Sequence, residues 1–171
     1  MAFVLLPIAC YILKSLSLYT ISKRRGIHNS WISWMPVFNG WMLGCISDQY
    51  RYVTRGETKR RRTALLVMPV VEVVLAIALL VVTLIALVME VPSGDPLNVA
   101  KVVLSVVLLL IRILHFVVEQ IAICDYHRSC DPENAMLFFV IGVVVSPLYP
   151  LFLFLNRNKE LGMPPRISEP V

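Results

Sequence analysis

The sequence predicts an all-α integral membrane protein with three spanning helices. Hydrophobic residues make up 58% of the 171-residue chain, and its mean hydropathy is +0.76. This apolar share is well above that of soluble domains. The apolar residues lie in runs close to the roughly 20 residues that cross a bilayer, with short basic stretches between them. We therefore expect a single membrane domain over residues 1–171, with a polar cytoplasmic tail over residues 156–171.

Five apolar runs are candidate membrane segments: residues 2–21, 30–46, 64–89, 102–124 and 135–155. The first run has no basic residue before it and no small-residue cleavage site after it, so it is expected to be a retained helix and not a signal peptide. The second run contains Pro36, Asn39 and Gly40, and the fifth contains Pro147 and Pro150. Because such residues interrupt helices, only the first, third and fourth runs are predicted to span the membrane.

The basic residues orient the chain. Most of the 16 Lys and Arg residues follow the first, second and fourth runs or lie in the tail. These residues favour the cytoplasmic side, so five crossings would place basic clusters on both sides. The conflict disappears if runs 30–46 and 135–155 are re-entrant or interfacial. The alternative is four or five spanning helices, because run 135–155 is long enough for a kinked crossing.

Four charged side chains and one histidine stand inside the predicted spans: Lys14, Glu72, Arg112, Glu119 and His115. A charged side chain at the bilayer centre costs about 2.5–3.5 kcal/mol on insertion scales, so each needs a partner or a role. Lys14 and Glu119 each precede an inner basic residue by nine positions, which predicts that they share one depth and can pair. The set is predicted to form an intramembrane polar cluster that either holds the helices together or lines a polar pathway.

Run 30–46 carries two further patterns. Trp31, Trp34 and Trp41 fall near one face if the run is a continuous helix, and tryptophan favours the membrane interface. Gly40 and Gly44 form a G-x-x-x-G pair, which allows another helix to approach closely. The run is therefore predicted to provide interfacial or packing residues.

The loop after run 30–46 is strongly basic. Lys59, Arg60, Arg61 and Arg62 are consecutive and follow Arg55 closely. Each basic residue near the cytoplasmic surface contributes about 1 kcal/mol of attraction to anionic lipid. The sequence predicts that this loop faces lipid.

No pattern in the chain predicts catalysis or a cofactor. There is no phosphate-binding glycine loop and no recognisable set of nucleophile, base and orienting group. Cys124, His127 and Cys130 lack an evident fourth ligand for zinc, and the four cysteines are expected to be free thiols. The basic residues lie between apolar runs and not along one polar face, so we expect no nucleic-acid partner. Because no catalytic set is recognisable, we also expect no enzyme activity.

Two stretches carry a resemblance to a known family. They read YTISKRRGIHNSWISWMPVFNGWMLGCISDQYRYVTRGETKRRR and LFLFLNRNKELGMPPR. Together they resemble small multi-pass membrane proteins of unknown function from Gram-positive bacteria. A more distant likeness, to families with a glycine, tryptophan, proline and asparagine pattern after the first helix, rests on Gly26, Trp34, Pro36 and Asn39. The resemblance implies a bacterial cytoplasmic membrane and brings no activity with it.

Two functions follow as expectations. One is a structural or accessory subunit that binds a protein partner or anionic lipid at the inner membrane face. The other is a small solute or ion transporter or channel whose charged site lies near mid-membrane. Membrane lipid is the expected partner in both cases, together with a membrane protein complex or a homo-oligomer.

Overall fold

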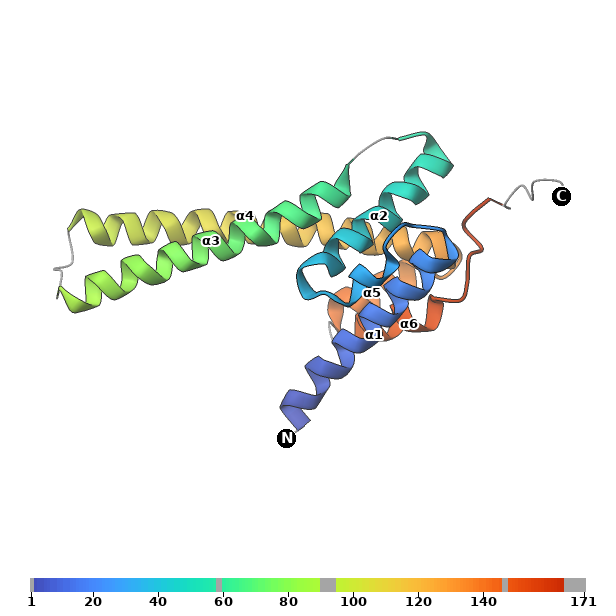
Figure 1. Cartoon of the computed structure of the whole chain (residues 1–171), viewed down its shortest axis with the longest axis horizontal. Coiled ribbons are helices and arrows are strands. Elements are labelled where there is room, and N and C mark those ends of the chain that lie inside the picture. Colours follow the sequence, from blue (N-terminus) through green and yellow to red (C-terminus); the bar gives the residue numbers. More distant parts are fainter. Residues whose placement is uncertain (1, 58–59, 90–94, 146–147, 165–171) are drawn as a thin grey trace.

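The chain folds into helices that meet at one end of a long helical hairpin (Figure 1). The computed structural model describes residues 2–57, 60–89, 95–145 and 148–164. Its α-helices in this part are α1 (Ala2–Arg24), α2 (Pro36–Arg55), α3 (Arg61–Val88), α4 (Pro96–Cys130), α5 (Ala135–Val144) and α6 (Tyr149–Asn156). A short 3₁₀ helix, η1 (Ser30–Trp34), precedes α2. The described part contains no strand, so the all-α class predicted from the sequence is confirmed.

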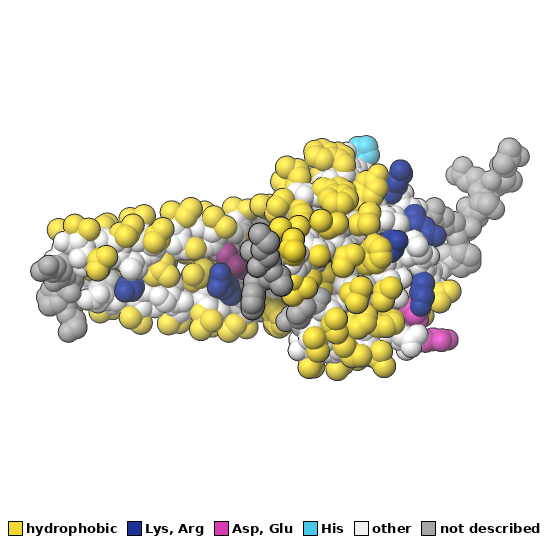
Figure 2. All heavy atoms as spheres, turned by 90° about the horizontal axis from the view of Figure 1, so that it is seen from below, with side chains coloured by type: hydrophobic (Ala, Val, Ile, Leu, Met, Phe, Trp, Pro, Cys, Tyr) yellow, Lys and Arg dark blue, Asp and Glu magenta, His cyan; other side chains and the backbone are white. Residues whose placement is uncertain are grey.

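Three helices are long and apolar enough to cross a membrane: α1 from Leu5, α3 and α4. They coincide with the three predicted spans, although α3 begins three residues earlier and α4 extends further at both ends. Helices α3 and α4 project together away from the other elements (Figure 1). Each of the two helices contains a continuous apolar stretch of 18 residues in which no residue is buried. Their surface is suited to lipid or to another membrane helix, and hydrophobic side chains cover most of it (Figure 2).

The contact between α3 and α4 follows a heptad-like seam. On α3 the less exposed positions recur at alternating spacings of four and three residues: Leu65, Met68, Glu72, Leu75, Leu79, Val82 and Ala86. On α4 they recur in the same way: Lys101, Leu104, Leu108, Ile111, His115, Val118 and Ala122. This is the spacing of antiparallel helices that pack knobs into holes. The seam is apolar except near its middle, where Glu72 meets His115, and at its outer end, where Lys101 lies.

Local sequence explains where these helices begin and end. Pro36 and Pro96 occupy first-turn positions, where the missing N–H of proline costs nothing. The side chain of Asp95 accepts a hydrogen bond from Leu97 N at 3.0 Å and caps α4. Gly56 ends α2 with φ +68°, a left-handed conformation that glycine adopts without strain.

Segment 30–46 is divided at Pro36, one of the three residues predicted to interrupt it. The break falls at Met35, which the following proline forces into an extended conformation. Asn39 and Gly40 lie within α2 and do not interrupt it. The helix continues to Arg55, so part of the predicted basic loop is helical.

The path of this segment begins and ends at the basic end of the bundle. After α1 ends at Arg24, the chain runs back along α1, where the carbonyl oxygen of Trp34 accepts from the hydroxyl of Tyr11. That contact lies 13 residues, or about 20 Å, back from the end of α1. Helix α2 then returns to the basic end, where Arg51 contacts Asp125.

Segment 135–155 follows a similar path through α5 and α6, which are separate short helices. Of the two prolines predicted to interrupt it, Pro150 lies in the first turn of α6, and Pro147 lies outside the described residues. Beyond α6 the chain returns to the end of α4, where Leu161 N donates to the carbonyl oxygen of Cys130 at 3.1 Å and Gly162 N to that of Ser129 at 3.3 Å. Both ends of the segment therefore lie beside the C-terminal end of α4. A re-entrant segment would take such a path, and its depth in a bilayer stays a prediction.

A buried core joins these elements where they meet. It draws side chains from α1, α2, the start of α3, the end of α4, and α6: Leu18, Ile21, Met42, Leu43, Ile46, Leu65, Ala122, Ile123, Tyr126, Cys130 and Leu153. Within the predicted polar tail, residues 157–164 pack against this body. Arg24 Nη1 donates to the carbonyl oxygen of Asn158 at 2.8 Å, and Lys159 Nζ lies 2.7 Å from Asp131 Oδ2. Residues 165–171 lie outside the described part of the chain.

Candidate functional site: charged clusters along helix α4

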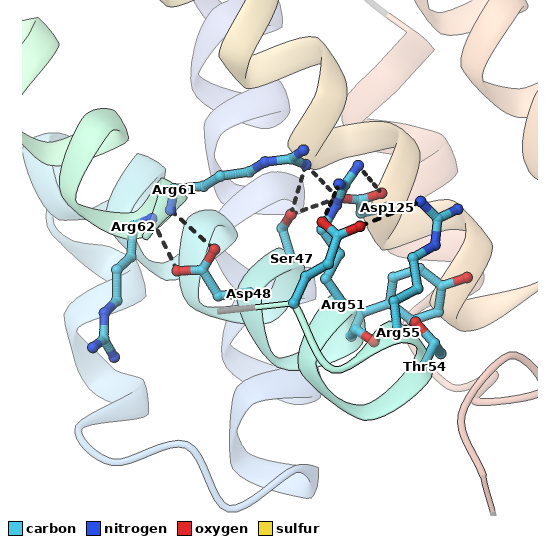
Figure 3. A network of polar contacts seen from close by, with 10 residues as sticks. Ser47, Asp48, Arg51, Thr54, Arg55, Arg61, Arg62 and Asp125 are labelled. Atoms are coloured by element: carbon cyan, nitrogen blue, oxygen red, sulfur yellow. Dashed lines mark hydrogen bonds and ion pairs between the residues drawn. The ribbon is translucent and has the colours of Figure 1, made fainter. Parts of the chain in front are cut away.

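A buried carboxylate links three helices at the basic end of the molecule. Asp125 of α4 is 2% exposed. Its Oδ2 accepts hydrogen bonds from Ser47 Oγ at 2.7 Å, Arg51 Nε at 2.7 Å and Arg61 Nη1 at 2.6 Å (Figure 3). Ser47 and Arg51 belong to α2, and Arg61 begins α3. The Asp125 cluster, made of these four residues, therefore fixes the position of α2 and α3 on α4.

The surroundings of Arg51 favour its charged form. The hydrogen bond to Asp125 raises the pKa of Arg51 above its ordinary value. Arg51 also contacts Glu57 Oε2 at 3.1 Å, so a second carboxylate offsets the charge of the two arginines. Burying an ion pair is favourable only when further hydrogen bonds satisfy its groups, and Ser47 supplies one.

The carboxylate of Asp48 caps the N-terminal end of α3 from a different helix. Asp48 of α2 accepts from the backbone N of Arg61 at 3.0 Å and of Arg62 at 3.2 Å (Figure 3). These N–H groups have no partner within their own helix, and the negative charge also suits the positive end of the helix dipole. Two neighbouring residues of α2 thus contact Arg61: Ser47 accepts from its guanidinium, and Asp48 accepts from its backbone N.

The prediction that the basic loop faces lipid is wrong for Arg61, whose guanidinium is engaged by Asp125. Counting charges in a loop does not reveal which of them turn inward. Arg60 and Arg62 are exposed. The side chain of Arg62 extends away from the Asp125 cluster in Figure 3. Lys59 lies outside the described residues.

The predicted intramembrane cluster forms two neighbouring groups. In the first, Lys14 Nζ of α1 lies 2.8 Å from Glu119 Oε1 of α4, so the predicted contact is confirmed. The ammonium group also lies 5.3 Å from the ring centre of Tyr149, a cation–π distance. This ion pair connects α1 to the hairpin across 105 residues of sequence.

The second group lies about one helical turn from Glu119, toward the N-terminal end of α4. Glu72 Oε1 is 2.7 Å from His115 Nδ1 within the seam, and Glu72 Oε2 is 3.9 Å from Arg112 Nε. A polar pair inside an apolar seam fixes the register of two helices, because any slip would leave each group against hydrocarbon. The Glu72 group therefore orients the hairpin, while the Lys14 pair attaches α1 to it.

The tryptophan and glycine patterns have different outcomes. The predicted tryptophan face is wrong, because Pro36 places Trp31 and Trp34 in η1 and Trp41 in α2. The predicted glycine packing site is confirmed against the start of α3. A Cβ on Gly40 would lie 3.2 Å from Leu65 O, and one on Gly44 only 2.5 Å from Arg62 Cα.

The Asp125 cluster is the feature that sequence reasoning missed. Asp125 immediately follows the predicted end of a span at Cys124 and lies outside every predicted membrane segment. The available signal is the absence of glycine and proline from residues 97–131, which allows α4 to continue until Pro132. Extended to Cys130, the helix brings Asp125, Tyr126 and Ser129 into the buried body.

The fold and these clusters define a helical membrane protein whose charged residues join its helices. Among the described residues, no group of three His, Cys, Asp or Glu side chains is placed to hold a metal ion. Cys45, Cys124 and Cys130 form no disulfide. No family model, curated protein or solved structure matches this chain.

Proposed function

We propose that the protein is an accessory subunit of a membrane-protein complex, and that its α3–α4 hairpin packs against a membrane helix of the partner. One observation carries the proposal. The side chain of Arg112 is 68% exposed on a surface that is otherwise largely apolar. In the space-filling view, isolated charged side chains interrupt the hydrophobic surface of the hairpin (Figure 2).

The depth of Arg112 makes this exposure costly. It lies 16 residues after Pro96 and 18 before Cys130, about 25 Å from either end of α4. A charge at the centre of a spanning helix costs about 2.5–3.5 kcal/mol on insertion scales. A carboxylate on a partner helix would offset that cost and would give the contact its specificity.

Contacts within the chain leave much of this guanidinium uncommitted. Arginine carries five N–H donors in a planar fork. Glu72 lies 3.9 Å away, and its other oxygen is already held by His115. Among the described residues no other carboxylate pairs with Arg112, so most of its donors are available to a partner.

The pairing of the remaining polar residues supports this role over that of a transporter. Lys14 contacts Glu119, and Glu72 contacts His115. Side chains that neutralise one another within the chain hold helices together. A polar pathway would need them to face a shared aqueous space.

The proposal is tested by extracting the protein from its native membrane in mild detergent and measuring the mass of the particle. We expect the wild type to migrate as a hetero-complex larger than the 19.4 kDa chain. Arg112→Leu should release the subunit, while Arg112→Lys should retain part of the complex because it keeps the charge.

A matched control is Arg55→Leu, which removes an exposed arginine from α2, outside the hairpin. It should leave the complex intact. An Arg112→Leu protein that stays in the wild-type complex would contradict the proposal. A homo-oligomer that supports solute flux would replace it with the transporter.

A further inference from the structure

A pocket of about 510 Å³ opens beside the start of α3. It lies between the turn after α1, the side of α2 and the first residues of α3. Ile27, Trp41 and Tyr52 supply its apolar part, and Arg60 and Arg62 line its basic part. This volume is within the range of pockets that bind small ligands.

The acidic residues of the pocket are already engaged. Both oxygens of Asp48 accept hydrogen bonds from the backbone at the start of α3. Glu57 accepts from Arg51 and lies 4.0 Å from Arg55. Their negative charge is therefore directed at groups of the protein itself.

The two arginines that line the pocket, unlike its acidic residues, are not paired in this way. The described residues offer no carboxylate partner to the side chain of Arg60 or of Arg62. Burial raises the pKa of the neighbouring Cys45 thiol to about 11, so at neutral pH this group adds no negative charge. Two uncommitted guanidinium groups beside an apolar wall suit a ligand with an anionic end and a hydrocarbon end. Arginine forks match phosphate oxygens in particular.

The position of the pocket points to the membrane surface. It lies at the end of the bundle where the basic residues gather, which is the expected cytoplasmic side. One residue that lines the pocket, Trp41, is a tryptophan. Tryptophan at this level is typical of the boundary between headgroups and acyl chains.

From this arrangement we propose that the pocket binds the phosphate group of an anionic lipid through Arg60 and Arg62, with the lipid's apolar part against Trp41 and Tyr52. This site goes beyond the proposed docking of a partner helix. It lies on α2 and α3 at the basic end and does not involve Arg112.

The test measures binding of a short-chain phosphatidylglycerol to the purified full-length protein in neutral detergent, with the matching phosphatidylcholine as reference. The wild type should prefer phosphatidylglycerol at least tenfold. Arg60→Gln combined with Arg62→Gln should weaken its binding about 30-fold, as expected for two charges near a membrane surface. The variant should fold, since losing positive charge at the start of α3 favours the helix dipole.

The matched control combines Lys23→Gln with Arg55→Gln, which removes the same charge from two exposed residues outside the pocket. It should weaken binding less than threefold. Equal losses in the two double variants would overturn the site, because binding would then follow net charge alone. The Arg60 and Arg62 variant should also keep the Arg112-dependent complex, which separates this proposal from the previous one.

A third arm distinguishes lipid from free phosphate. Tyr52→Ala removes part of the exposed apolar wall and should weaken phosphatidylglycerol binding several-fold. Inorganic phosphate should compete only weakly. If inorganic phosphate binds as tightly as the lipid and Tyr52→Ala has no effect, the ligand is a free anion and the assignment to lipid is wrong.

Discussion

Lys14 and Glu119 are the clearest case of two residues that depend on each other. Their charged atoms are 2.8 Å apart and both side chains are largely shielded from solvent. Removing one charge strands the other in a poorly hydrated environment, which costs more than removing the pair.

A double-mutant cycle with Lys14→Met and Glu119→Gln should therefore show non-additive losses. We expect a coupling energy of about 1–3 kcal/mol, read from thermal unfolding in detergent. Additive losses, within about 0.5 kcal/mol, would mean that the two residues act independently.

The contact between Asp131 and Lys159 should make the C-terminal segment sensitive to acid. The hydrogen bond from Lys159 lowers the pKa of Asp131 below its ordinary 3.8. A carboxyl group whose pKa is lower in the folded state stabilises the fold above its unfolded pKa, and this stability is lost as the pH falls through the folded pKa.

The measurement is the difference in Tm between the wild type and Lys159→Met. Since the lysine is 46% exposed, we expect a gap of only about 1–4 °C at pH 6, which narrows as the pH falls below the ordinary pKa of Asp131. A gap that stays constant as the pH is lowered into this range would show that the lysine acts through packing and not through its charge.

At the residue scale, the sequence predicts which two side chains form an ion pair when their depth in the membrane is the deciding factor. Lys14 and Glu119 could be matched because both are isolated in apolar helices at the same distance from basic residues. Arg61 could not be assigned, because its inward direction depends on how α2 and α4 pack around it. Asp125 was missed for the same reason, since its three donors come from other helices.

At the scale of elements, the approach of α2 to α3 depends on Gly44. A Cβ there would lie 2.5 Å from Arg62 Cα and 2.8 Å from its backbone nitrogen, so the backbone itself must move. Gly44→Ala should destabilise the protein by about 1–3 kcal/mol, in the range of overpacked cores.

Gly40→Ala is the matched control, because it makes the same change one turn earlier in α2. Its Cβ would meet Leu65 O at 3.2 Å, which a small shift can relieve, and both variants gain the same helix propensity. We expect Gly40→Ala to cost less than Gly44→Ala in thermal unfolding. A Gly44→Ala protein as stable as the wild type would show that the helices separate at no cost.

The number and order of the spanning helices were predictable, whereas the course of segment 30–46 was not. An apolar run must match the bilayer, so its length is encoded locally. The tryptophan face was extrapolated with a helical period across Pro36, which the structure shows to be the start of a new helix. A period holds only inside one helix, so a single break changes which side chains share a face.

At the scale of the whole molecule, the arrangement of the chain predicts its topology. Gly56 and Asn158 both lie near the basic end, and Asn98 lies in the first turn of α4 at the far end of the hairpin. With positive charge inside, cysteines placed at Gly56 and Asn158 should react with an impermeant reagent only after the cells are permeabilised. A cysteine at Asn98 should react in intact cells.

Labelling at Asn158 decides between the two predicted layouts. Protection in intact cells agrees with a segment 135–155 that dips into the membrane and returns. Reaction from outside would mean that this segment crosses fully and that the contacts of residues 157–164 with α4 do not form in the membrane.

The separation of 105 positions between Lys14 and Glu119 also corresponds to a delay during synthesis. At about 5–20 residues per second, the partner of Lys14 emerges about 5–20 s after Lys14 itself. During that interval α1, the least apolar of the three spanning helices, carries a cation whose carboxylate has not yet been made. The wait is shorter in the α3–α4 hairpin, where Glu72 and its partner His115 are 43 positions apart. The order of translation therefore favours a late entry of α1, with the first helix to be made becoming the last to settle at full depth.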